Sequence, residues 1–320
     1  MSIDVIKPGL CTTVQDAGRW GYQHLGVPVN GPMDVLAHSL ANLLVGNLAS
    51  CGTLEVTLQG PSLLFRTTTL LAIAGADLGA QLDGVPLPPG TAVKVQPGTL
   101  LSFAKRNHGA RAYIAVGGGY MLPLVLGSSS TFRRGGLGGV NGRALLAGDV
   151  LQTRSSFRNL SRLQLQLQLP IALQPDPATM ARSAIRVIPG REWQAFTEAS
   201  QRALLSEPYR ISNQSERMGY RLQGAPLALQ APLELLSEAV TFGTLQVPAD
   251  GQPIVLMADR QTTGGYPKIA HVASVDLPLL AQRLPGEEVR FTLIAIEEAQ
   301  RLAVERSRMI TRLENDYAAH

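Results

Sequence analysis

Two segments of this 320-residue chain place charged and hydrogen-bonding side chains between apolar stretches. Residues 212–221 read Ser-Asn-Gln-Ser-Glu-Arg-Met-Gly-Tyr-Arg, and residues 259–268 read Asp-Arg-Gln-Thr-Thr-Gly-Gly-Tyr-Pro-Lys. The second segment follows the wholly apolar run 254–258, which predicts a buried strand. A strand that ends in hydroxyls, glycines and a lysine can deliver hydrogen-bond donors to a pocket. A long polar hairpin would explain each segment as well.

Three of the four cations in these segments, Arg217, Arg221 and Lys268, indicate the charge of a ligand. Like charges repel one another when they are held together. Polar side chains at the end of a barrel also cost desolvation free energy unless water or a ligand satisfies them. An anionic substrate would relieve both costs, so we predict an anion-binding pocket built from residues 213–221 and 259–268.

A glycine-rich loop at residues 135–142 is a second candidate for anion binding. Its sequence approximates a dinucleotide-binding fingerprint, but Asn141 replaces the third glycine and no strand–helix unit surrounds it. The backbone N–H groups of such a loop can cradle an anion, and three arginines flank it: Arg133, Arg134 and Arg143. A surface loop closed by glycine turns is the alternative explanation.

Other common catalytic motifs are absent from the sequence. No Gly-Lys pair occurs, so there is no Walker A loop. None of the five histidines is spaced from Cys, Asp or Glu as a metal ligand would be, so we expect no metal site. Residues 128–130 are three serines without a Gly-x-Ser-x-Gly elbow, which favours a hydroxyl-rich turn.

The composition narrows the class of protein. Lys and Arg outnumber Asp and Glu by 28 to 24, a formal net charge of +4, and aromatic residues make up 5%. Neither value favours nucleic-acid binding. The two cysteines, Cys11 and Cys51, argue against a disulfide scaffold and favour a reducing, cytoplasmic location. No signal peptide and no apolar run long enough to span a bilayer is visible, so we expect no membrane association.

Short apolar or alternating runs separated by Gly and Pro predict that strands dominate the chain. In the first half they lie at residues 56–64, 67–74, 92–95, 99–103 and 110–116, with one helix between Pro32 and Gly46. In the second half we predict helices at 191–205 and 297–315. The Pro-rich stretch 170–177 follows an alternating run at 163–169, which places a domain boundary near residue 178. We predict a mainly β fold with a few helices and two β-barrel domains, residues 1–178 and 179–320.

Several longer motifs resemble one protein family. The first, at residues 8–21, reads Pro-Gly-Leu-Cys-Thr-Thr-Val-Gln-Asp-Ala-Gly-Arg-Trp-Gly, and others lie at 31–34, 41–47, 54–58, 212–224 and 252–270. On these motifs the chain is identified as a member of the KipA-like family, also called biotin-dependent carboxyltransferase-like or allophanate hydrolase subunit 2. The resemblance spans about residues 3–300 and implies that both barrels are cyclophilin-like.

The family implies three possible roles. Stand-alone members include the C subunit of 5-oxoprolinase, which acts with the A and B subunits to open 5-oxo-L-proline to L-glutamate with ATP hydrolysis. In urea carboxylase the related pair transfers a carboxyl group from carboxybiotin to urea, and KipA itself counteracts the KipI-type inhibitor of a kinase. The sequence contains no Ala-Met-Lys-Met biotin-attachment site, and its two polar segments are similar to those of the oxoprolinase subunit. We therefore expect the first role, with the carboxyltransferase and regulatory roles as alternatives.

The resemblance also implies partners and a cofactor. Family members pair with a KipI-like subunit, and the oxoprolinase includes a LamB/YcsF-like subunit, so we expect the chain to be inactive alone. We expect ATP to serve the complex, at a site that one of the partners can supply, and we expect no covalently attached biotin.

The residue roles follow from the chemistry that the resemblance implies. A lactam is a stable amide, and its opening needs cations and aligned donors around the developing negative charge. We expect four residues to be catalytic, with the cations stabilising charge and a carboxylate taking a proton: Glu216, Arg217, Asp259 and Lys268. We expect substrate to be bound by further donors, cations and glycines: Asn213, Gln214, Tyr220, Arg221, Gln261, Thr262, Thr263, Gly264, Gly265, Tyr266 and Arg143.

Overall fold

The computed structural model describes residues 1–154, 166–168 and 184–318, and it describes only the backbone of 166–168 and 317–318. The predicted domain boundary near residue 178 and the ends of the alternating run 163–169 lie outside these residues. The described chain forms two compact units. The first unit contains described residues of Met1–Arg19, Asn30–Pro177 and Ser307–His320, and the second contains those of Trp20–Val29 and Ala178–Arg306.

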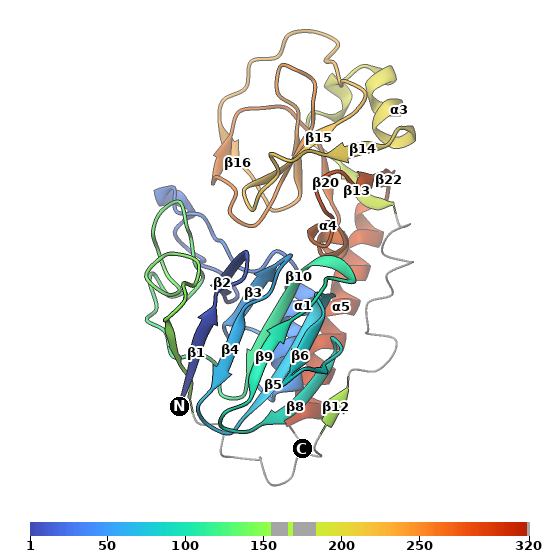
Figure 1. The fold of residues 1–320 in the computed structure, drawn as a ribbon. Coiled ribbons are helices and arrows are strands. Elements are labelled where there is room, and N and C mark those ends of the chain that lie inside the picture. Colours follow the sequence, from blue (N-terminus) through green and yellow to red (C-terminus); the bar gives the residue numbers. More distant parts are fainter. Residues whose placement is uncertain (155–165, 169–183, 319–320) are drawn as a thin grey trace. The chain divides into compact units, whose positions relative to one another are not determined.

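The strands of the first unit form two sheets, each with six strands among the described residues (Figure 1). One sheet has the order β11-β1-β4-β9-β6-β7 and the other has the order β12-β8-β5-β10-β3-β2. The strands are β1 (Ser2–Lys7), β2 (Cys11–Gln15), β3 (Thr53–Thr57), β4 (Ser62–Phe65), β5 (Thr69–Asp77), β6 (Ala80–Leu82), β7 (Val85–Pro86), β8 (Thr91–Val95), β9 (Leu100–Phe103), β10 (His108–Val116), β11 (Val150–Gln152) and β12 (Gln166–Gln168). The predicted strand 56–64 is in fact the end of β3, a turn and β4.

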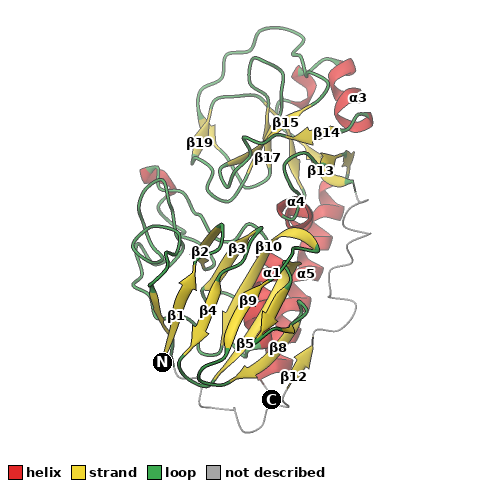
Figure 2. Cartoon of the chain, in the orientation of Figure 1, coloured by secondary structure: helices red, strands yellow, loops and turns green. Residues whose placement is uncertain are grey.

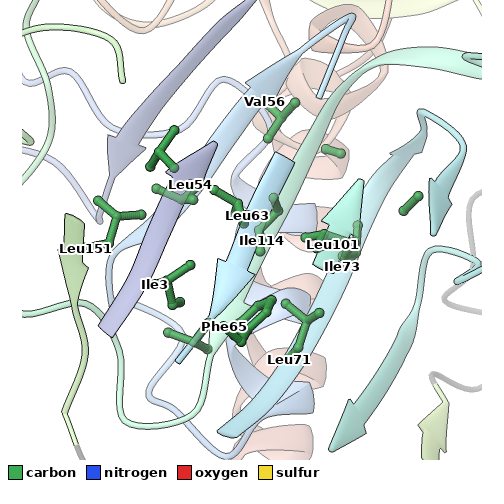
Figure 3. Packing of buried hydrophobic residues seen from close by; sticks show 14 of the residues in the cluster. Ile3, Leu54, Val56, Leu63, Phe65, Leu71, Ile73, Leu101, Ile114 and Leu151 are labelled. Atoms are coloured by element: carbon green, nitrogen blue, oxygen red, sulfur yellow. The ribbon is translucent and has the colours of Figure 1, made fainter. Parts of the chain in front are cut away.

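The core of the first unit lies between these two sheets. Its buried side chains come from both, as Figure 3 shows for Ile3, Phe65 and Leu101 of one sheet and Leu54 and Ile114 of the other. Each of these five side chains is at most 1% exposed. Alternating apolar residues in both sheets therefore produce a single apolar layer, because successive residues of a strand point to opposite faces.

The outer face of the second sheet packs against helix α1 (Val35–Leu44). Asp34 caps this helix by accepting a hydrogen bond from the N–H of Ala37 at 2.9 Å. Pro32 lies just before the cap rather than in the first turn. Figure 2 shows helices α1 and α5 beside the strands of this unit, and Leu313 of α5 packs into the α1 cluster.

The most buried part of the 8–21 motif stabilises this fold. Arg19 is fully buried, and its guanidinium donates to the carbonyls of Val125 and Ser130 and to Asn30 Oδ1, at 2.8–2.9 Å. The carboxylate of Asp16 accepts hydrogen bonds from the predicted hydroxyl-rich turn, including Ser128 Oγ at 2.6 Å and Ser130 Oγ at 2.7 Å. These contacts explain the polar composition of the motif without a ligand.

The second unit is a nearly closed barrel. Its sheet has the order β21-β14-β15-β18-β17-β20-β13-β22. The two end strands, β21 (Glu288–Val289) and β22 (Phe291–Leu293), are separated only by Arg290, so one stretch of chain pairs with both β14 and β13 and closes the sheet. The other strands are β13 (Ile185–Pro189), β14 (Tyr209–Ile211), β15 (Gly219–Gln223), β17 (Thr244–Gln246), β18 (Ile254–Leu256) and β20 (Lys268–Val272).

A separate two-stranded ribbon and a few helices complete this unit. The ribbon pairs β16 (Glu238–Ala239) with β19 (Thr263–Gly264). The α-helices are α3 (Glu198–Ser206), α4 (Leu277–Ala281) and the start of α5 (Ile296–Ala318), and the 3-10 turns are η1 (Gln23–Leu25), η3 (Trp193–Ala195) and η4 (Ser274–Asp276). The predicted helix 191–205 begins later than expected, because Thr197 accepts a hydrogen bond from Ser200 N–H and caps α3.

The prediction of a mainly β fold with a few helices is confirmed. Of the helices that the structure describes, none has the length and apolar character that crossing a membrane requires.

Candidate functional site

Both polar segments lie in the second unit and extend from neighbouring strands of its barrel. Residues 212–218 connect β14 to β15, and residues 257–267 lead from β18 through β19 to β20. Strands β15 and β18 pair directly, so the two segments begin at adjacent strands of the sheet.

Strand register places one row of residues across four neighbouring strands of the barrel. Arg221 of β15 pairs with Ile254 of β18, Ile254 pairs with Gln246 of β17, and Gln246 pairs with Lys268 of β20. Directly paired residues point to the same face of a sheet. Arg221, Gln246 and Lys268 therefore share one face, with the apolar Ile254 between Arg221 and the other two.

A β-bulge brings a histidine onto the same face. Thr244, Leu245 and Gln246 pair with His271, Ala270 and Lys268, so Ile269 has no partner residue on β17. Without the extra residue, Lys268 and His271 would point to opposite faces, since they are three positions apart. The imidazole Nδ1 of His271 lies 3.1 Å from Thr244 Oγ1. Burial lowers the pKa of His271, the charge of Lys268 lowers it further, and Glu192 opposes both.

The opposite face of these strands is apolar. Leu245, Val255 and Ala270 are fully buried there, and Tyr220 pairs with Val255 and is 3% exposed. The structure thus places Tyr220 with the core-forming residues, on the other side of the sheet from Lys268.

Lys268 is nearly buried and is surrounded by carboxylates. Its side chain is 6% exposed, and its ammonium Nζ lies 3.4 Å from Glu238 Oε2. Its backbone N–H donates to Glu192 Oε2 at 2.9 Å. Glu238 comes from strand β16 of the ribbon, which Figure 1 labels in the second unit, and its contact with Lys268 brings the ribbon to the polar face of the barrel.

Gln246 supplies a hydrogen-bond donor that no described residue uses. The side chain is 2% exposed, and Oε1 accepts from Gln261 Nε2 at 3.4 Å, whereas the buried Nε2 has no partner among the described residues. Gly264 of the ribbon lies directly over this amide, and a Cβ at that position would lie 2.4 Å from Nε2. A glycine is therefore needed at 264 to leave room for the amide.

Arg217 and Asp259 form a bidentate ion pair between the two segments. Arg217 Nε and Nη2 donate to the Oδ2 and Oδ1 atoms of Asp259, each at 2.9 Å, and the side chains are 13% and 9% exposed. The backbone N–H of Asp259 also donates to the carbonyl of Arg217 at 2.8 Å. Arg217 and Lys268 each face a carboxylate, so mutual repulsion of unmatched cations does not describe this site.

The remaining predicted residues of the segments lie in the β14–β15 turn and in or beside the ribbon. Asn213, Gln214 and Glu216 are exposed in the β14–β15 turn. The carbonyl of Thr262 accepts from Val240 N–H at 3.1 Å. Thr263 is exposed in the ribbon, Gly265 follows it, and Tyr266 is 51% exposed.

Arg143 belongs to the first unit, where Asp149 holds it. Its Nη1 and Nη2 donate to the two carboxylate oxygens of Asp149 at 2.7 and 2.8 Å. These hydrogen bonds raise the pKa of Arg143. Within the glycine loop, the N–H groups of Gly136 and Gly142 donate to loop carbonyls, which favours a loop closed by its own turns.

Four residues of the polar face lack a prediction from sequence: Glu192, Glu238, Gln246 and His271. Gln246 carried a usable signal, since it is a polar residue within an apolar stretch ahead of the predicted strand. Glu192 reaches Lys268 through the pairing of β13 with β20, Glu238 reaches it through the ribbon, and His271 joins the same face through the β-bulge. Among the described residues, no group of three or more His, Cys, Asp or Glu side chains is arranged to hold a metal ion.

Comparison with known proteins gives a consistent set of relatives. The profile of the carboxyltransferase domain family, subdomain A and B, matches residues 25–293. The chain is 40% identical to the C subunit of 5-oxoprolinase from Haemophilus influenzae over 300 residues, 94% of each chain. It is also 40% identical to the corresponding 5-oxoprolinase subunit of Escherichia coli over 311 residues, 97% of each chain. The crystal structure of Kluyveromyces lactis urea carboxylase matches with a TM-score of 0.89 at 30% identity, over 98% of this chain and 29% of that one.

Proposed function

Because the chain belongs to the family of carboxyltransferase domains with subdomains A and B, we propose that it is the C subunit of an ATP-dependent 5-oxoprolinase. In this role it would act with the A and B subunits to open 5-oxo-L-proline to L-glutamate. The observation that carries the proposal is the 40% identity to two such subunits over nearly the full length of both chains.

The polar face of the second unit supports this choice. 5-Oxo-L-proline carries a carboxylate and a lactam carbonyl, and attack on the carbonyl carbon moves negative charge onto its oxygen. Lys268 Nζ carries three N–H groups, and Glu238 is their one acceptor among the described residues. The N–H groups of Gln246 Nε2 have no acceptor among the described residues. We assign these two donors to the carbonyl oxygen, where they stabilise the developing charge. The ribbon must move to admit substrate, because both groups are nearly buried.

The roles of the other predicted residues change accordingly. Arg217 and Asp259 hold the two segments together, and their ion pair positions the chain that carries Gln261. Gln261 orients the Gln246 amide through its hydrogen bond to Oε1. Arg221 lies on the same face but beyond Ile254, and we assign it to the periphery of the site.

We place ATP on a partner of this chain. The loop 135–142 is the phosphate cradle that the sequence offers, but Gly136 and Gly142 donate their N–H groups within the loop, and Gly139 donates to the carbonyl of Ser129. Asp149 matches the charge of Arg143 beside it. The loop therefore does not fit a phosphate group in this structure. We propose that two partners, one KipI-like and one LamB/YcsF-like, complete a cytoplasmic enzyme that needs no attached biotin.

Reconstitution tests this function. The chain is purified alone and together with the A and B subunits of its own source, and L-glutamate formation from 5-oxo-L-proline is measured with ATP. We expect turnover only in the full mixture. Turnover by the single chain would contradict the subunit role, and a full mixture that leaves 5-oxo-L-proline intact would contradict the substrate.

Carboxyl transfer is the second candidate, because the urea carboxylase structure matches 98% of the chain. The chain would make up only 29% of such a protein. Carboxylation of urea after addition of carboxybiotin and a KipI-like partner would favour this candidate over the oxoprolinase.

A further inference from the structure

Two cations of the second unit converge on one carboxylate at the edge of the polar face. Arg191 Nη1 lies 2.5 Å from Glu238 Oε1, and Lys268 Nζ lies 3.4 Å from Glu238 Oε2. Each oxygen of Glu238 therefore faces a different cation. The hydrogen bond from Arg191, followed by that from Lys268, lowers the pKa of Glu238, so this group is ionised at neutral pH.

Without Glu238, the charged groups around Arg191 and Lys268 sum to one positive charge, which a single monoanion would neutralise. Arg191 and Lys268 contribute two positive charges, and Glu192, which is 7% exposed, contributes one fixed negative charge. Glu192 Oε1 lies 3.9 Å from Arg191 Nε, and Oε2 accepts from the Lys268 N–H. Among the described residues, His271 shares the face of Lys268, and burial lowers its pKa, so it adds no positive charge at pH 7. Arg221 lies on that face beyond Ile254. One unmatched positive charge remains, and Glu238 now neutralises it.

Glu238 is suited to leave this position. Its side chain is 40% exposed and that of Arg191 is 71% exposed, so solvent screens their attraction. An exposed ion pair of this kind changes an equilibrium constant by at most about fivefold. Glu238 also belongs to a ribbon of only two paired residues on each strand, Glu238–Ala239 with Thr263–Gly264. A competing carboxylate would therefore meet little resistance.

We propose that Arg191 and Lys268 form a subsite for the carboxylate of a small substrate, and that Glu238 occupies this subsite until the substrate displaces it. The identification of that substrate as 5-oxo-L-proline rests on the proposed function. Gln246 pairs with Lys268 across adjacent strands, where paired Cα atoms lie about 4.5–5.5 Å apart. A five-membered lactam can thus place its carboxylate at Arg191 and one N–H group of Lys268, and its carbonyl oxygen at Gln246 and a second N–H group of Lys268.

Opposite changes in KM test this subsite in the assembled enzyme. Glu238→Gln removes the competing charge, so KM for 5-oxo-L-proline should fall by up to about fivefold. Arg191→Gln removes a charge-assisted hydrogen bond to the substrate carboxylate, so KM should rise about tenfold, with kcat nearly unchanged. The matched controls are Glu198→Gln and Arg202→Gln, which break an exposed ion pair of helix α3 and should leave KM unchanged.

A binding measurement separates this inference from the proposed function. Calorimetry compares 5-oxo-L-proline with its uncharged amide, 5-oxo-L-prolinamide, on the full chain and its complex. The carboxylate should bind more weakly to Arg191→Gln than to the parent, and the amide should bind both equally. Arg191-dependent binding without turnover would support the subsite and overturn the function. The subsite would be overturned if the enzyme turns over with the same KM in Arg191→Gln and Glu238→Gln as in the parent. A KM that rises in Glu238→Gln would also overturn it.

Discussion

Removing the charge of Arg217 is expected to destabilise the second unit strongly. The Arg217→Met substitution keeps an apolar stem of similar length but takes the guanidinium away from Asp259. Both side chains are nearly buried, at 13% and 9% exposure, and two hydrogen bonds of 2.9 Å join them. The Asp259 carboxylate would then lie in a poorly hydrated environment without its cation.

The expected loss is about 3–5 kcal/mol of unfolding free energy, the usual cost of removing one partner of a buried ion pair. The α3 pair Arg202–Glu198, whose side chains are 72% and 83% exposed, provides the comparison. Arg202→Met should cost about 0–1 kcal/mol. Replacing both Arg217 and Asp259 by apolar residues should recover part of the loss, because neither charge of the pair is then left buried without its partner.

Urea unfolding followed by tryptophan fluorescence measures these differences in the second unit. The chain has two tryptophans, Trp20 and Trp193, and both belong to that unit. A loss in Arg217→Met no larger than that in Arg202→Met would refute the structural role of the pair. It would then return Arg217 to the candidates for substrate binding.

Three further predictions concern both units. Burial lowers the pKa of His38 to about 4, so the unfolded chain takes up a proton below pH 6.5 before the folded chain does. Stability should therefore fall by about 3 kcal/mol between pH 6.5 and 4, and urea midpoints of His38→Gln should lack this slope. Burial alone would raise the pKa of Asp16, but hydrogen bonds led by that of Ser128 lower it, so its stabilisation is present above pH 3.8 and disappears in stronger acid. Asp16→Asn should cost about 1.5–3 kcal/mol at pH 7, and equal stability of the two proteins by calorimetry would contradict this. Gly264→Ala should displace the Gln246 amide and reduce kcat/KM about tenfold with little change in the urea midpoint, whereas unchanged kinetics would exclude that amide from the site.

Local sequence patterns predicted the strand-rich fold well. Apolar runs bounded by Gly and Pro located β5, β8, β9 and β10 to within a few residues, because turn residues interrupt strands locally. The predicted strand 56–64 crossed the turn signal Gly60-Pro61, because apolar residues lie on both sides of it. Leu58, an apolar residue, begins that turn with a positive φ of 61°.

The site was predictable only where its residues follow each other along the chain. Gln261 and Lys268 were predicted because their segment, residues 259–268, follows the apolar run 254–258. The contacts of Glu192 and Glu238 with Lys268 join residues that are far apart in the sequence. Hydrophobic periodicity and composition do not predict such contacts. The side of the sheet that Lys268 shares with His271 depends on the bulge at Ile269, and one extra residue reverses the alternation.

The kinetics of Lys268→Met in the assembled complex test the central claim most directly. Methionine keeps the buried stem and removes the ammonium that we assign to the substrate, and Lys94→Met, at an exposed position of β8, is the matched control. We predict that kcat/KM for 5-oxo-L-proline falls roughly 10- to 150-fold in Lys268→Met, with normal assembly of the complex, and stays at the parent value in Lys94→Met. Equal kcat/KM in the two variants would contradict the placement of the site on this face of the barrel.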